Sequence, residues 1–190
     1  MSLPDAAKNR HRAPLRPFDV PTASLSVFGL GFLRPAPGTW GSLPTPAAVA
    51  VLLLAGAPWW AVTLTSAVLL VLSSVACVAF GRYAEERFGR KDAAEVVCDE
   101  TAGVSLALLF VPADIATRCS LGSNDALGAI LLTGVVTGGA FVLFRVSDII
   151  KPQPARALEK LAHGWGVLID DLVAGVYSAV AWWVLVLLIL

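Results

Sequence analysis

Five charge-free apolar stretches alternate with clusters of charged residues along the chain. They lie at about 43–56, 58–80, 101–113, 126–144 and 172–190. Runs such as Leu69–Leu72 are apolar on every side, unlike the alternating pattern of a membrane β-strand. Because a helix needs about 20 apolar residues to cross a bilayer, the second, fourth and fifth stretches predict spanning helices. The first and third must borrow flanking residues, thin the bilayer or enter it without fully crossing.

Composition supports a membrane location. The 190 residues are 57% hydrophobic and 15% charged, whereas a soluble domain has about 45–50% apolar and about 25% charged residues. The 14 Lys and Arg balance the 14 Asp and Glu, so the chain lacks the net positive charge of a nucleic-acid-binding protein. We therefore predict an all-α, polytopic membrane helical bundle of about five apolar helices with cytoplasmic interfacial segments.

The charged residues predict the orientation. They fall in four zones, 1–34, 82–100, 114–125 and 145–171, which hold five, four, one and four basic residues. With five crossings, the three basic zones share one side, which the positive-inside rule places in the cytoplasm, with the C-terminus outside. We expect residues 1–27, which contain no apolar signal-peptide core, to be a flexible cytoplasmic tail, and residues 28–190 to form the membrane domain.

A first polar cluster, from Arg34 to Ser42 (RPAPGTWGS), precedes the first apolar stretch. Its glycines let the backbone approach a ligand closely, and Thr39 and Ser42 offer hydroxyl groups. Free N–H groups at a helix start attract phosphate. The segment equally fits a turn and helix cap with Trp40 anchored at the membrane surface, and the residues leave both interpretations open.

Two pairs of adjacent acids stand at the entrances of the third and fifth apolar stretches, Asp99 with Glu100 and Asp170 with Asp171. A carboxylate at a membrane edge is costly unless it is paired or functional, and adjacent carboxylates repel unless a cation is near. Carboxylate oxygens are the ligands that Mg2+ prefers. Capping of the helix N-termini is the alternative. The helices that follow both pairs run outward in parallel, so we predict one shared carboxylate cluster.

A third polar cluster places Arg145, Asp148 and Lys151 at intervals of three residues, on one face of a helix that leaves the membrane. Its cations suit phosphate oxygens and its carboxylate suits a metal. Salt bridging at the membrane interface is the alternative interpretation.

Other phosphatase chemistries lack their residues. No cysteine begins a CX5R motif, no DxDx(T/V) nucleophile motif occurs, and only two histidines are present. Cys77, Cys98 and Cys119 are widely spaced and have no metal-binding pattern, so we expect them to be packing residues that chemistry does not need.

Four motifs in order resemble the phosphatidylglycerophosphatase A family over about residues 28–180. They are GTWGS at 38–42, VCDE at 97–100, FRxxDIxKP at 144–152 and GxGxxxDDxxAG at 164–175. The resemblance implies a Mg2+-dependent phosphatase that converts phosphatidylglycerophosphate into phosphatidylglycerol and inorganic phosphate. It also implies the bacterial inner membrane as the location. The predicted partners are therefore a phosphorylated glycerophospholipid and the bilayer, without nucleic acid; the oligomeric state stays unknown.

The motifs also imply roles for individual residues. Asp99, Glu100, Asp170 and Asp171 resemble the acidic catalytic or metal-binding set, and Asp148 is a further catalytic candidate. The candidate phosphate-binding residues are Arg145, Lys151, Thr39, Ser42 and Arg34. Four positions depart from the usual family residue, Ala93, Ser147, Gln153 and His163, and none of them removes an acid or a cation.

Two questions stay open from the residues alone. Metal-assisted attack by water and attack by a carboxylate, for which Asp99 is our candidate, are both possible. A non-enzymatic membrane carrier or scaffold is the alternative function, although a carrier would more naturally place polar residues at mid-membrane.

Overall fold

A computed structural model describes residues 19–122, 124–150 and 164–189. The helices are α1 Val20–Leu25, η1 Leu30–Phe32, α2 Pro37–Ser42, α3 Pro44–Leu54, α4 Trp59–Phe88, α5 Cys98–Ala107, α6 Ala113–Arg118, α7 Ala126–Ile150 and α9 Gly164–Ile189. These ranges contain no strand, which confirms the all-α prediction. Lys151, Gln153 and His163 lie outside the described residues, as do residues 1–18. Of the range 1–27 predicted as a tail, the structure describes residues 19–27, which include α1.

Three helices of the described chain are long and apolar enough to cross a membrane: α4, α7 and the Gly164–Val186 part of α9. The first and third apolar stretches form shorter helices, α3 with 11 residues and α5 with 10. At 1.5 Å per residue, each covers about 15 Å, roughly half of a bilayer core. The described residues therefore hold three helices of spanning length where the sequence predicted about five apolar helices.

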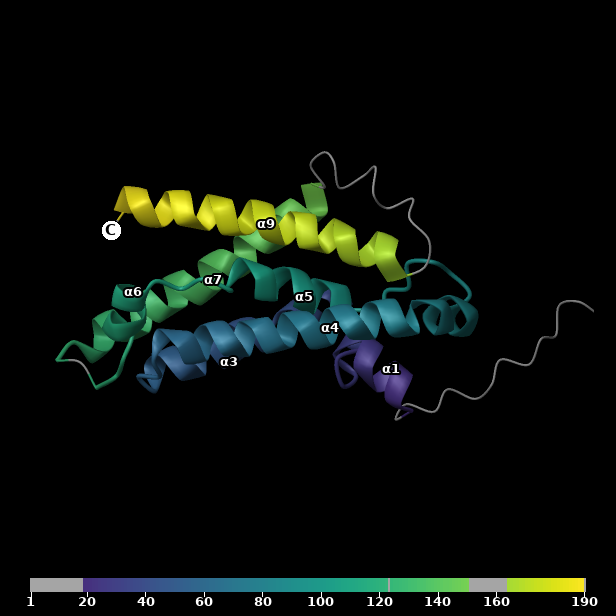
Figure 1. Cartoon of the computed structure of the whole chain (residues 1–190), viewed down its shortest axis with the longest axis horizontal. Helices are drawn as coiled ribbons and strands as arrows, with labels where there is room; N and C mark the ends of the chain where they lie inside the picture. Colours follow the sequence, from purple (N-terminus) through teal and green to yellow (C-terminus); the bar gives the residue numbers. More distant parts are fainter. Residues whose placement is uncertain (1–18, 123, 151–163, 190) are drawn as a thin grey trace, which may run out of the picture.

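The helices run back and forth along one long axis (Figure 1). The end of α4, the start of α5, the end of α7 and the start of α9 lie toward one end, called here the α5 end. The α3–α4 turn, α6 and the C-terminus lie at the opposite α6 end, where Leu121 N donates a 3.0 Å hydrogen bond to Leu54 O. Because the short α3 and α5 run along the same axis, the chain reverses direction as often as five crossings require.

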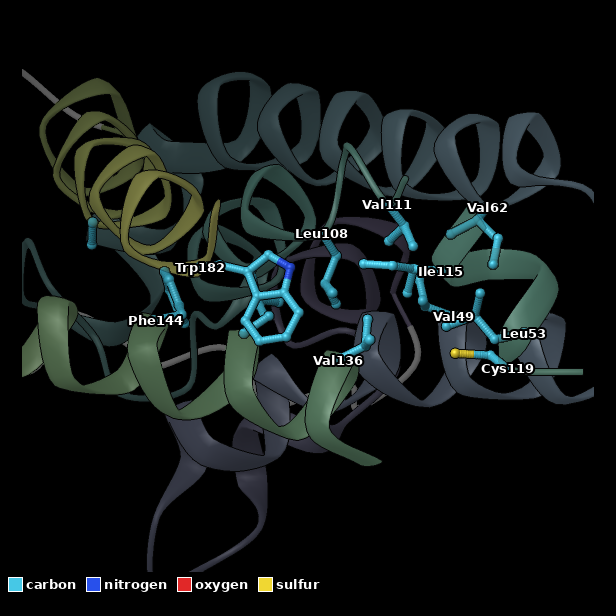
Figure 2. Close-up of a cluster of buried hydrophobic side chains, with 14 residues drawn as sticks. Val49, Leu53, Val62, Leu108, Val111, Ile115, Cys119, Val136, Phe144 and Trp182 are labelled. Carbon is cyan, nitrogen blue, oxygen red and sulfur yellow. The ribbon is translucent and has the colours of Figure 1, made fainter. Parts of the chain in front are cut away.

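An apolar core fills the middle of the bundle and the α6 end (Figure 2). Phe144 from α7 is fully buried, and Trp182 from α9 packs against Gly139 of α7. A second apolar cluster, with Leu25, Cys77 and Cys98 among its members, joins α1, α4 and α5 at the α5 end. Cys77, Cys98 and Cys119 are all buried and reduced, as expected for packing residues.

The most extensive helix contact is between α5 and α9, which run in the same direction (Figure 1). A Cβ atom on Gly175 would lie 2.5 Å from the Gly103 carbonyl oxygen, and one on Gly103 would lie 2.6 Å from the carbonyl oxygen of Asp171. Only glycine at both positions allows this approach. The contact brings α5 against α9 at Asp171 and Gly175, which lie about two and three turns after the start of α9 at Gly164.

Candidate active site

Three carboxylates from two helices converge at the α5 end. Asp99 and Glu100 lie in the first turn of α5, and Asp171 lies on α9 next to the Gly103 contact. One ligand oxygen from each lies within 4.8 Å of the other two. Asp99 and Asp171 are only 3% and 5% exposed. The predicted convergence of the two acid pairs is thus observed for three of the four acids; Asp170 is buried beside the group but is not one of these three ligands.

Burial makes this cluster electrostatically costly. Burial raises the pKa of Asp99 to about 6, and the negative charge of Asp92 acts in the same direction. The pKa of Glu100 is also raised, first by burial and then by the charges of Asp99, Asp171 and Asp148. The helix start contributes the equivalent of only about half a positive charge, too little to balance three acids.

Each of the three acids also has an unsatisfied oxygen. Asp99 Oδ1, Glu100 Oε2 and Asp171 Oδ2 are buried and have no hydrogen-bond partner among the described residues. A buried carboxylate oxygen is costly unless it is paired or coordinates a metal. The three acids could therefore hold a cation between α5 and α9, and helix capping does not account for their unpartnered oxygens.

A guanidinium group lies against the acids. Arg145 of α7 forms an ion pair with Asp148, with Nη1 at 2.9 Å from Oδ2. A Cβ atom on Gly38 would overlap the Glu100 carboxylate and would lie 3.2 Å from Arg145 Nη1. The start of α2, the start of α5 and the end of α7 thus meet at one point, and the absence of a side chain at Gly38 permits it.

The other phosphate-binding candidates differ in position. Thr39 is half-buried on α2, next to Gly38. The Ser42 hydroxyl donates to the Gly38 carbonyl oxygen at 2.7 Å, so it is used within its own helix and caps neither α2 nor α3. Arg34 is exposed, and its charge acts on Glu95. Burial acts to raise the pKa of Glu95, but Arg90 and Arg34 help to hold this pKa below its ordinary value.

Two contributors to the site were not singled out from the sequence. Asp92, on the exposed α4–α5 connection, adds negative charge next to Asp99. Thr101 holds α2 against α5, since its hydroxyl donates to the Gly41 carbonyl oxygen at 2.6 Å. The hydroxyl also lies 3.1 Å from the Val97 carbonyl oxygen, and only the packing of α2 adds the contact with Gly41.

A surface cavity of about 670 Å³ lies at the opposite, α6 end. Its lining includes Trp59, Asp114 and Thr117 and none of the predicted site residues. The candidate active site is therefore defined by convergent charges and not by this cavity.

Long apolar helices define a helical membrane protein, and its buried carboxylate cluster, with an arginine nearby, could hold a cation. The sequence model of the phosphatidylglycerophosphatase A family matches residues 23–186. The chain belongs to the phosphatidylglycerophosphatase A family. Membership places it among enzymes that hydrolyse phosphate monoesters, as the four sequence motifs predicted.

Relatives from three bacteria match most of the chain. A Haemophilus influenzae protein is 32% identical over 168 residues, which cover 83% of this chain and 86% of the relative. An Escherichia coli K12 protein is 32% identical over 154 residues, covering 80% and 75%. Both are named phosphatidylglycerophosphatase A. A Bacteroides thetaiotaomicron protein, 36% identical over 174 residues with 90% and 98% covered, is named "Putative phosphatidylinositol-3-phosphatase". No solved structure matches the chain.

Proposed function

We propose that this chain is a Mg2+-dependent phosphatidylglycerophosphatase, which hydrolyses the terminal phosphate of phosphatidylglycerophosphate to give phosphatidylglycerol and inorganic phosphate. The observation that carries the proposal is the buried group of Asp99, Glu100 and Asp171, with its unpartnered oxygens next to Arg145. Family membership supports the reaction class, and the names of two relatives support the substrate.

The donor set favours Mg2+ over softer metals. All three ligand atoms are carboxylate oxygens, which suit Mg2+, whereas zinc sites usually contain cysteine or histidine. Asp148 is held by its ion pair with Arg145. Three convergent ligands therefore favour one ion over two. When bound, the ion supplies Lewis-acid stabilisation of the phosphoryl oxygens.

The chain's own residues have distinct proposed roles around the phosphate. Arg145 would bind two phosphate oxygens, because its planar guanidinium group matches their geometry. Asp148 would orient Arg145 through the 2.9 Å ion pair. Lys151 follows Asp148 by three residues and would add a second cation, and Asp170 would add negative charge beside Asp171. Thr39 and Arg34 remain candidate contacts for the substrate headgroup.

We place the site on the cytoplasmic face of the bacterial inner membrane. Of the basic residues that the structure describes, most lie toward the α5 end, including Arg82, Arg87 and Arg90, whereas Arg118 lies at the α6 end. The positive-inside rule then orients the α5 end toward the cytoplasm. The substrate phosphate would enter from the inner leaflet.

The decisive experiment is phosphate release by the purified protein in detergent, with Mg2+ or with EDTA. Three lipids would be compared: phosphatidylglycerophosphate, phosphatidic acid and phosphatidylinositol 3-phosphate. We expect preference for phosphatidylglycerophosphate and loss of turnover in EDTA. Preference for the inositol lipid would overturn the substrate assignment, and equal turnover in EDTA would overturn the metal. Absence of turnover on all three lipids would favour the carrier or scaffold, which the family membership and the gathering of charges at one end disfavour.

A further inference from the structure

The connection between α1 and α2, residues 27–34 and called here the Phe28 loop, exposes large apolar side chains. Phe28 is 92% exposed, and Leu33 and Phe32 are 43% and 40% exposed. None of the three lies on a helix of spanning length. In water, neighbouring exposed apolar side chains on an ordered loop usually mark a surface for a partner.

The backbone of the loop holds Phe28 outward. Val27 and Phe28 have φ angles of 48° and 56°, a left-handed conformation that is unusual for β-branched or bulky residues. Ser26 organises the turn: its hydroxyl donates to Thr22 O at 2.7 Å and accepts from Gly29 N at 3.0 Å. Such strain persists only where the surrounding structure enforces it. The conformation of the turn therefore fixes the exposed position of Phe28.

The loop is attached directly to the segment that leads into the active site. Val97 N donates a 2.9 Å hydrogen bond to Leu25 O, just before the loop. Gly31 packs against the Glu95 carbonyl oxygen so closely that a Cβ atom would overlap it. Two residues after Val97 comes Asp99. The Phe28 loop therefore packs directly against the segment that leads into the acidic cluster.

The position of the Phe28 loop along the axis of the bundle indicates what the loop contacts. Cys77 of α4 donates from Sγ to Gly164 O at 3.4 Å, at the start of α9, and the charge-free part of α4 ends at Gly81. The membrane surface therefore lies close to this level, and α1 packs beside α4 there (Figure 1). Exposed aromatic and aliphatic side chains followed by an arginine, here Arg34, are typical of segments that lie in the headgroup region.

We propose that the Phe28 loop inserts into the bilayer interface beside the active site. Phe28, Phe32 and Leu33 contact lipid acyl chains, and Arg34 contacts lipid phosphate groups. The loop thereby holds the acidic cluster at the depth of the headgroups, so that a phosphorylated lipid reaches the site without leaving its leaflet. The insertion of the loop into the membrane does not depend on the proposed function. Its effect on turnover of the lipid rests on the proposed function.

Depth measurement tests the contact without any activity. A Phe28→Cys variant would be labelled with an environment-sensitive fluorophore and reconstituted into phosphatidylcholine–phosphatidylglycerol vesicles. Ala94→Cys, exposed on the α4–α5 connection at the same end, is the matched control, and the wild type with its buried cysteines is the blank. We expect lipid-borne nitroxide to quench the label at 28 and aqueous iodide to quench the label at 94. Quenching of both labels by iodide alone would overturn the proposal.

Kinetics test the consequence for catalysis. Asparagine tolerates a left-handed conformation, so Phe28→Asn removes the apolar side chain while keeping the turn, and Phe28→Leu keeps an apolar side chain. On phosphatidylglycerophosphate in vesicles we expect KM to rise about tenfold for the Asn variant and little for the Leu variant. Turnover of a short-chain, water-soluble form of the lipid should be unchanged in both. An equal loss on both substrates would show a merely structural role and overturn the proposal.

Discussion

Asp99, Glu100 and Asp171 are held close together by packing although their charges repel each other. Without a cation, this repulsion lowers the stability of the site, and a bound ion would offset it. Removal of one acid should therefore have opposite effects on activity and on the stability of the metal-free protein.

We expect Asp171→Asn to lower phosphate release at least about 100-fold, because it removes one of three proposed ligands. The rise in Tm that Mg2+ should produce in the wild type would also disappear, since binding to the folded state is its cause. Thermal unfolding in detergent, with Mg2+ or EDTA, measures this. Asp114→Asn changes an exposed acid at the α6 end and should retain both properties. A normal Mg2+ response of Asp171→Asn would contradict the ligand assignment.

Asp19, which contacts Arg87, is a second single residue whose contribution depends on pH. Hydrogen bonds from Thr22 and Tyr83 hold the pKa of Asp19 below its ordinary value, and Arg87 adds an ion pair at 3.0 Å. A lowered pKa means that ionised Asp19 stabilises the folded state above the unfolded pKa, and that this contribution is lost as pH falls through the folded pKa. Asp19→Asn should therefore loosen α1 at pH 7, measured by hydrogen exchange of α1. The difference from the wild type should vanish in acid; a difference that persists there would exclude ionisation as its cause.

At the scale of elements, the contact between α5 and α9 places the acids. Both helices carry glycine where their backbones touch, at Gly103 and Gly175. Asp99 and Glu100 thereby lie in the first turn of α5, whereas Asp170 and Asp171 lie about two turns inside the parallel helix α9, which starts at Gly164. The distance between the helices is set by two missing side chains and not by the acids themselves.

Gly103→Ala should separate these helices, because the new Cβ would meet both the Asp171 carbonyl oxygen and the Phe144 ring. We expect a loss of about 1–3 kcal/mol in stability and a strong loss of activity. Gly134→Ala is the matched control: it lies on α7, where a Cβ would meet no atom within 4 Å. Its Tm should be unchanged or slightly higher. If both variants unfolded at the wild-type temperature, the close approach would be wrong.

At the scale of the whole molecule, the two ends differ in charge and in chemistry. The three-acid cluster, Arg145 and most of the described basic residues lie toward the α5 end, and Arg118 lies at the α6 end. In intact cells, we expect the cysteine introduced by Ala94→Cys to be protected from a membrane-impermeant maleimide. The cysteine introduced by Arg118→Cys should react, and the three native cysteines are buried. Permeabilised cells should label both. Labelling of residue 94 in intact cells would reverse the proposed orientation.

Sequence alone determined the all-helical membrane class, the three long spans and the family. Charge-free runs of about 20 residues need no tertiary information, because the cost of burying a charge in lipid acts on each residue separately. The same reasoning located the acid pairs at membrane edges and the cations near them. The sequence did not decide whether α3 and α5 cross the bilayer completely, since a run of 10 to 14 apolar residues fits either a partial or a complete crossing.

Only the tertiary structure decided which of those residues meet. It selected Asp99, Glu100 and Asp171 from the predicted cluster of four acids, brought Gly38 of α2 against Glu100 and Arg145, and used the Ser42 hydroxyl within its own helix. It also gave Phe28 its outward position through the turn at Ser26. These contacts depend on helix separation and on the direction of each side chain. Glycine contacts between distant segments set both, and no local pattern in the sequence records which glycines face each other.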